Sequence, residues 1–235
     1  MTAKDVKITP VGFISYPHLD QPKVNEKGDP RYMVDILFDK DTDLSKLEQE
    51  IEKAYLEKFS LKRLPSTFKS PIKDMHFKYE DAMQDLKDFP DDEKIKKNAE
   101  RCKIYKNRKK VSLQCKAEHK PRFFDMADGV SKEVITPADI KEIFYPGAKC
   151  MAQYKVFAYE YKEKDAKSGQ KGVSIWFAIN AVVARKELGE RWISSGADKQ
   201  EDVFAAMGID LEDLGGGEEV AKSEEEIAVE TMLEG

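Results

Sequence analysis

The chain has 235 residues, of which 40% are hydrophobic and 36% charged, and its formal net charge at pH 7 is −5. That length is sufficient for one large domain with its own hydrophobic core. No apolar run approaches the roughly 18–20 residues of a membrane-spanning helix, and three cysteines are too few for a disulfide framework. We therefore expect an intracellular protein with reduced thiols, which excludes membrane, secreted, collagen-like and wholly disordered classes.

Charge is distributed unevenly along the sequence. Residues 197–235 hold two lysines and thirteen acidic residues, a net charge of −11, whereas residues 1–196 hold 38 basic and 32 acidic residues, a net charge of +6. A basic domain can attract a polyanion, and an acidic segment can mimic one or simply increase solubility. We predict a domain over residues 1–196 and a disordered acidic tail over 197–235, with one short helix near 203–207.

The first elements in chain order are two strands and a helix. Residues 6–16 are expected to form a strand interrupted at Pro10, and the proline-containing residues 17–30 a loop. Residues 31–38 carry a buried-type side chain at every second position, which predicts a strand. A helix follows, with Asp41 or Asp43 as its cap, because five apolar residues share one helical face: Leu44, Leu47, Ile51, Ala54 and Tyr55.

Residues 61–110 form the least regular part of the sequence. Residues 80–93 contain seven acids and one lysine, and residues 94–122 contain twelve basic residues and two acids. We interpret residues 61–110 as an insertion that is partly helical and partly flexible. The acidic block alone is typical of a solvated surface, and the basic block that follows is the larger source of positive charge in the domain.

The second half begins with a strand over 111–118 and a short aromatic segment over 121–126. Thr136 and Pro137 predict a helix start, since a hydroxyl cap precedes proline at the first helical position. Two long strands, at 149–161 and 173–183, then form a hairpin with apolar residues at alternate positions. The expected core residues of its second strand are Val173, Ile175, Phe177, Ile179, Ala181 and Val183.

These elements predict a mainly β fold with minor α content. Five or six strands, a helix after the second strand and a short helix before the last hairpin favour a five-stranded Greek-key barrel of the OB type. The charged insertion and the acidic tail would be additions to that barrel.

The opposite face of the hairpin is the strongest functional signal. It mixes lysines with aromatic rings, where an open sheet surface is normally polar. Exposed bases of single-stranded nucleic acid stack on flat rings while cations hold the phosphates. The alternative is a second hydrophobic layer, with the insertion folded over these rings. The predicted DNA-binding residues are Phe157, Tyr159, Tyr161, Trp176, Lys149, Lys155, Lys109, Lys110, Arg122 and Phe123.

Signals for catalysis are weak. Cys102, Cys115 and His119 lack a fourth ligand at a spacing suited to zinc, and the histidines form no recognisable triad pattern. Acids between Glu80 and Asp92 could hold magnesium in a nuclease, although a solvated acidic loop explains them as well. We therefore expect neither an enzyme, nor a cofactor, nor a metal site.

Four segments resemble motifs of a phage protein family. They are residues 11–19 (VGFISYPHL), 32–40 (YMVDILFDK), 144–148 (FYPGA) and 172–182 (GVSIWFAINAV). The family, formerly a domain of unknown function, consists of OB-fold single-stranded DNA-binding proteins, similar in plan to the replication proteins of short-tailed coliphages. The resemblance implies a role in phage DNA replication and recombination, in the cytoplasm of a bacterial host.

The resemblance also implies that the tail contacts other replication proteins. The predicted partner-binding residues are Glu224, Glu225, Glu226, Met232 and Leu233. Independently, the negative charge of the tail suggests that it occupies the basic groove when DNA is absent. No membrane partner is expected, and a homodimer is left open. The competing functions are a protein-interaction or virion component without a nucleic-acid role and a metal-dependent nuclease.

Overall fold

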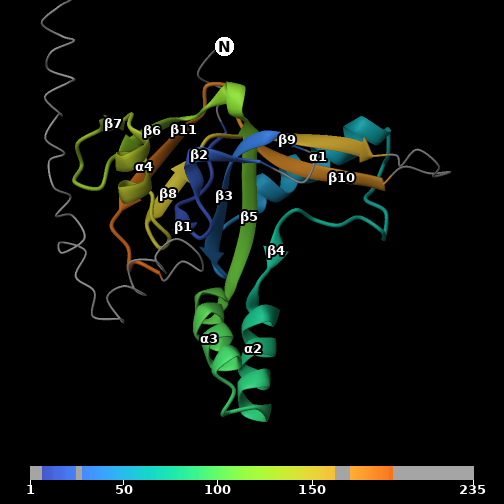
Figure 1. Cartoon of the computed structure of the whole chain (residues 1–235). Helices are drawn as coiled ribbons and strands as arrows, with labels where there is room; N and C mark the ends of the chain where they lie inside the picture. The colour runs from blue at the N-terminus through green and yellow to red at the C-terminus, as the bar shows by residue number, and fades with distance from the viewer. Residues whose placement is uncertain (1–6, 25–27, 162–169, 193–235) are drawn as a thin grey trace, which may run out of the picture. The chain divides into compact units, whose positions relative to one another are not determined.

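The computed structural model describes residues 7–24, 28–161 and 170–192 (Figure 1). The predicted tail, with its short helix and its five partner-binding residues, lies outside the described residues, as does most of the predicted hairpin connector. Among the described helices, none combines the length and the apolar content that a membrane crossing requires.

Five stretches of strand close into a ring, with β8 and β9 counted as one stretch. The pairing order is β1-β3-β5-β10-β9, and β8 pairs with the other edge of β1. Only Gln153 separates β8 from β9, so the ring closes through the chain itself. Neighbours in this ring are antiparallel except β5 and β10, which are parallel. This arrangement confirms the mainly β, OB-type fold. The bounds are β1 (Gly12–Ile14), β3 (Pro30–Asp39), β5 (Arg108–Lys116), β8 (Lys149–Ala152), β9 (Tyr154–Tyr161) and β10 (Gln170–Phe177).

Both strands of the predicted hairpin are broken. The first is divided into β8 and β9, and the second into β10 and β11 (Val182–Glu187). Asn180 in the intervening turn has φ 59°, and Ala181 N donates to Ala178 O (3.0 Å). Ile179, predicted in the core, is 62% exposed because it lies in this turn. β11 then pairs with β8 and with β6 (Arg122–Asp125), and β6 with β7 (Lys132–Val134), so the described sheet has eleven strands.

The region after β1 differs from the predicted loop. It contains β2 (His18–Val24), which pairs with β3 through an irregular register. Leu19 is 1% exposed and anchors β2 to the core. Pro22 is tolerated because β2 is an edge strand, where a missing backbone donor breaks no ladder. Of the strand predicted over 6–16, the described part contains β1 and an isolated bridge between Ile8 and Gln153.

The two helices that flank the barrel strands follow the predicted patterns. α1 (Ser45–Phe59) buries Leu47, Ile51 and Tyr55 against the sheet, and Asp43 Oδ1 accepts the backbone N–H of Ser45 (2.9 Å). α4 (Pro137–Ile143) begins at the predicted cap, where Thr136 Oγ1 accepts the backbone N–H of Asp139 (3.2 Å). The apolar spacing was sufficient to predict α1, although Leu44 and not Asp43 occupies its N-cap position. For α4 the capping residue gave the start of the helix.

The insertion contains a helical hairpin. α2 (His76–Asp88) and α3 (Glu93–Cys102) pack side by side near the start of β5 (Figure 1), and the short strand β4 (Lys73–Asp74) pairs with β5. The 3-10 turn η2 (Lys103–Tyr105) leads into β5, and a second one, η3 (Ala117–His119), follows it. β5 begins at Arg108, so the predicted insertion over 61–110 overlaps the barrel by three residues.

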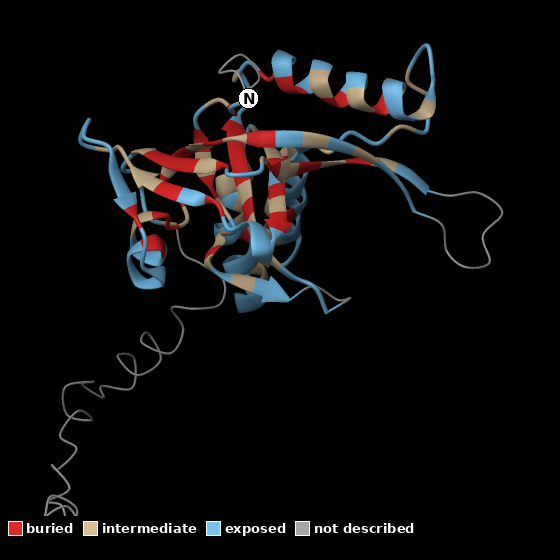
Figure 2. Ribbon diagram, turned by 90° about the horizontal axis from the view of Figure 1, so that it is seen from above, coloured by how far each residue is buried: buried red, intermediate tan, exposed pale blue. Residues whose placement is uncertain are grey.

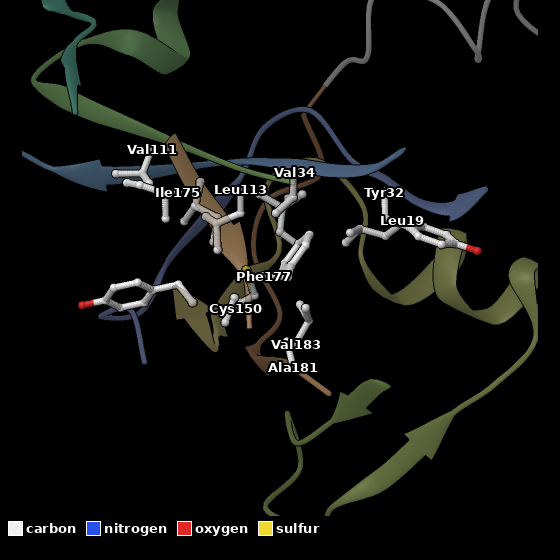
Figure 3. Close-up of a cluster of buried hydrophobic side chains, with 14 of the residues drawn as sticks. Leu19, Tyr32, Val34, Val111, Leu113, Cys150, Ile175, Phe177, Ala181 and Val183 are labelled. Atoms are coloured by element: carbon white, nitrogen blue, oxygen red, sulfur yellow. The ribbon is translucent and has the colours of Figure 1, made fainter. Parts of the chain in front are cut away.

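The core lies inside the barrel. Figure 2 shows the buried residues concentrated in the barrel strands and along one side of α1. Val34, Leu113, Ile175 and Phe177 come from three neighbouring strands and are at most 4% exposed, and Figure 3 shows them grouped together with Cys150. Since side chains alternate along a strand, the intervening residues of β3, β5, β9 and β10 face outward. This outward face carries the candidate site.

Candidate nucleic-acid interface

A groove of about 580 Å³ lies on the outward face of the barrel. It extends from β3 across β5 and β10 to β9. Seven of its nine lining residues come from the late hairpin, and the rest of the barrel contributes one cation and one amide. The lining residues are Arg31, Gln114, Phe157, Ala158, Tyr159, Tyr161, Gln170, Ser174 and Trp176.

Trp176 is held by hydrogen bonds that cross three strands. Its Nε1 donates to Ser174 Oγ (2.9 Å), and Gln114 Nε2 donates to the same oxygen (3.2 Å). Arg31 Nη1 donates to Gln114 Oε1 (3.1 Å), and the Arg31 guanidinium carbon lies 5.1 Å from the centroid of the Trp176 ring. These contacts fix the orientation of the indole before any ligand arrives, which reduces the entropy lost on binding.

Three further rings lie along β9. Phe157, Tyr159 and Tyr161 are 42%, 47% and 46% exposed, although they are large side chains on a sheet. The Phe157 ring meets Trp176 edge to face, with centroids 5.6 Å apart. The predicted alternative, a hydrophobic layer covering these rings, is inconsistent with such exposure in the described part of the chain.

Gly172 makes room for one of these rings. It is paired with Tyr159 across β9 and β10, and a Cβ added at Gly172 would lie 2.7 Å from Cζ and Oη of Tyr159. The tyrosine ring therefore lies over the glycine backbone. A side chain at position 172 would displace it.

Positive charge lies in the groove at Arg31 and beside it at Lys155. Lys155 Nζ lies 4.9 Å from the centroid of Phe157, and Lys155 is itself exposed. On the opposite side, Arg31 forms an ion pair with Asp29 (3.5 Å). A cation beside an exposed ring is the combination that holds a stacked base and its phosphate.

Lys109 and Lys110 of β5 differ in position. Lys110 faces outward, and its Nζ donates to Asp35 Oδ2 (2.7 Å), so this lysine is already paired. Ser112 Oγ also donates to Asp35. Lys109 shares its face of β5 with the buried Val111, away from the outward surface. Neither lysine lines the groove.

Three other predicted residues lie in strands outside the groove. Lys149 of β8 donates to Glu187 Oε2 (2.7 Å). Arg122 of β6 forms a two-point ion pair with Glu133 (2.8 and 3.0 Å). Phe123 is 1% exposed and packs on Phe144, with ring centroids 5.4 Å apart. Its prediction as a DNA-binding residue is corrected, because a ring in the core offers no free face.

Sequence reasoning missed Arg31 and Gln114. Both occupy outward positions of strands that were recognised from their alternation, but the pairing of β3 with β5 and of β5 with β10 could not be deduced from one sequence. The signal that could have pointed to Arg31 is its place at the start of an alternating strand, on the polar face. Ser174 was recognised as part of the hairpin face, but its role as the shared acceptor was not.

The residues considered for metal or nucleophilic chemistry are not assembled for it. The described part of the chain contains no group of three or more His, Cys, Asp or Glu side chains arranged to hold a metal ion. Burial raises the pKa of the Cys115 thiol to about 12, and its Sγ donates to His119 O (3.3 Å). Cys115 is therefore a core residue that remains protonated at neutral pH.

The comparisons with known proteins bear on the fold. No protein-family model matches the chain, and neither does any curated protein. The single-stranded DNA-binding protein from bacteriophage Enc34, in complex with ssDNA, is similar over 81% of this chain and 91% of its own, at 21% identity and TM-score 0.51. A second Enc34 structure is similar over 86% and 91%, at 20% identity and TM-score 0.52.

The single-stranded DNA-binding protein gp2.5 from bacteriophage T7 covers 84% of this chain and 93% of its own, at 14% identity and TM-score 0.43. That score is too low for an argument, so the conclusion rests on the Enc34 structures. The chain shares the fold of a phage single-stranded DNA-binding protein. The fold implied by the sequence motifs is thereby confirmed.

Proposed function

We propose that the chain binds single-stranded DNA with little dependence on base sequence, in phage DNA replication or recombination. The observation that carries this proposal is the groove in which Trp176, Phe157, Tyr159 and Tyr161 expose aromatic surface next to Arg31 and Lys155. Each base presents a flat π-face that can stack on such rings, worth about 1–3 kcal/mol per base. A duplex hides those faces, so the groove favours unpaired strands.

Two further observations support the proposal. The fold is that of a protein whose structure includes bound ssDNA. The groove also reaches β3 and β5, the second and third strands of the barrel, whose outer face OB folds use for oligonucleotides. The expected setting is the cytoplasm of an infected bacterium, and the protein would act by binding, without catalysing a reaction.

The acidic segment 197–235 has a regulatory role in this proposal. Its net charge of −11 allows it to compete with DNA for the basic surface of residues 1–196. When DNA displaces it, the segment becomes free to recruit other replication proteins, through Glu224–Glu226 and through Met232 and Leu233. The same cluster of carboxylates supports both roles, competition with DNA and recruitment of proteins.

The test is binding of a labelled oligothymidylate, followed by fluorescence anisotropy and by quenching of tryptophan emission. Trp176→Ala and Tyr159→Ala should each weaken binding by about 1–3 kcal/mol, which is roughly 5- to 150-fold. A matched control removes Phe77 and Phe89, two aromatics of the helical hairpin that are 52% and 60% exposed. The control should bind like the unmodified protein.

A folded Trp176→Ala/Tyr159→Ala protein with unchanged affinity would contradict the stacking role. If the unmodified protein bound no single strand, the protein-interaction or virion function would be favoured instead. Incubation of DNA with the protein and magnesium completes the comparison, because degradation of the DNA would point to a nuclease.

A further inference from the structure

A row of three cations crosses the barrel next to the groove. Lys23 of β2 pairs with Arg31 of β3, and Arg31 pairs with Lys116 of β5. Directly paired residues share one face of a sheet. Arg31 precedes the buried Tyr32, and Lys116 follows the buried Cys115, so all three side chains belong to the outward face.

This row is unfavourable for the protein alone. Like charges directly opposite each other on paired strands are destabilising. Sequences tend to break such local rules where a ligand supplies the compensation. Arg31 in addition has a buried Nε that lacks a hydrogen-bond partner among the described residues. Two carboxylates, Asp29 and Glu118, offset the three positive charges only in part. A chain of phosphates would supply the remaining negative charge.

The row is continuous with the aromatic groove. Arg31, the middle cation of the row, lies over Trp176 (5.1 Å). At the β2 end of the row, Lys23 Nζ donates to Tyr16 Oη (2.6 Å) and lies 5.0 Å from the centroid of the Tyr16 ring. Tyr16 in turn meets His18 edge to face, with centroids 4.6 Å apart. Tyr16 thus positions the Lys23 ammonium on the outward face.

The acids near the row leave it accessible. Asp29 pairs with Arg31 (3.5 Å) and Glu118 pairs with Lys116 (3.6 Å), and both carboxylates are more than half exposed. Exposed ion pairs contribute little to stability and are screened by salt. A polyanion can therefore replace these partners. The pair between Arg122 on β6 and Glu133 on β7 differs, because two hydrogen bonds join its side chains.

Resting on the proposed function, we propose that Lys23, Arg31 and Lys116 form the phosphate track of the DNA-binding site. A bound strand would stack its bases on β9 and β10, leave the hairpin at Trp176, and cross β5 and β3 to β2. Since neighbouring strands are about 4.8 Å apart, the three cations span about 10 Å of the sheet. The path runs across the strands of the sheet.

The test is the salt dependence of binding to a labelled oligothymidylate. Each phosphate contact on single-stranded DNA contributes about 0.7 to the slope of log K against log salt concentration. Lys23→Gln/Arg31→Gln/Lys116→Gln should therefore reduce the magnitude of the slope by about 2. Between 50 and 200 mM salt, that variant should lose about 20-fold less affinity than the unmodified protein.

A charge-matched control replaces Lys94, Lys97 and Arg101, three exposed cations of α3, with glutamine. Its slope should equal that of the unmodified protein. Because Arg31 also contacts Trp176, the double variant Lys23→Gln/Lys116→Gln is measured in parallel, with an expected change in slope of about 1.4.

The outcomes separate this inference from the proposed function. If the unmodified protein binds and both track variants keep its slope, the phosphate track is wrong and the base-stacking function stands. An equal change in the α3 control would also overturn the track, since it would reflect total charge. Failure of the unmodified protein to bind any single strand would contradict the proposed function itself.

Discussion

The contact between Gly172 and Tyr159 allows the stacking geometry to be changed without removing a ring. In Gly172→Ala, the new Cβ would lie 2.7 Å from Cζ and Oη and 3.2 Å from Cε1 of Tyr159. Ordinary van der Waals contacts begin near 3.4 Å. The tyrosine ring must therefore move outward by roughly 1 Å or rotate away.

The energetic consequences for folding and for binding should have opposite signs. The atoms in conflict belong to the far end of a partly exposed side chain, so the ring can move at small cost to stability. Alanine in a strand interior is favoured over glycine by about 0.5–1 kcal/mol. We therefore expect unchanged or slightly higher stability. Binding should weaken by up to the effect of Tyr159→Ala, about 1–3 kcal/mol.

A double-mutant cycle tests this reasoning. Affinities for oligothymidylate are measured for Gly172→Ala, Tyr159→Ala and the double variant, and urea unfolding gives the stability of each. Once Tyr159 is absent, Gly172→Ala should have no further effect on affinity, so the two changes should be strongly non-additive. Additive losses of affinity, or a loss of stability of several kcal/mol in Gly172→Ala alone, would refute this account of the glycine.

Three further predictions concern the tail, the sheet and the core. Deleting residues 215–235 should tighten DNA binding, most clearly at low salt, and weaker binding after deletion would contradict autoinhibition. Asp125→Asn should cost about 3–5 kcal/mol in urea unfolding, because Arg185 is only 9% exposed at its side chain and would lose its carboxylate. The hydrogen bond from Arg185 lowers the pKa of the Asp125 carboxyl. This stabilisation should therefore be present at neutral pH and decline as the pH falls through that lowered pKa. A difference in stability between the unmodified protein and Asp125→Asn that did not depend on pH would contradict this prediction. Phe123→Ala should lower the free energy of unfolding by about 3–5 kcal/mol and leave the oligonucleotide affinity of the folded protein unchanged, whereas a selective loss of affinity would return Phe123 to the interface.

The lysines show which features of the site a sequence pattern leaves open. Their sequence positions established that cations are abundant, but whether an ammonium group is available to DNA depends on where its carboxylate partner lies and on how exposed that ion pair is. Glu187 holds Lys149 and Asp35 holds Lys110, and both acids come from distant parts of the chain or from a neighbouring strand. Lys155, by contrast, was placed correctly beside the rings, because its neighbours on β9 and β10 belong to the predicted hairpin.

The sequence by itself determined the local features: the alternation of β3, the apolar stripe of α1, the cap at Thr136 and the aromatic face of the late hairpin. Each depends on residues within one or two strands or turns, where the periods of 2 and 3.6 suffice. Only the tertiary structure decided that β5 lies beside β10, which brings Gln114 and Arg31 to Trp176, and that Lys23, Arg31 and Lys116 share one row. Strand pairing brings together residues as far apart in sequence as Arg31 and Lys116, which are separated by 85 positions. The local pattern of β3 or of β5 does not specify which strand will be its partner.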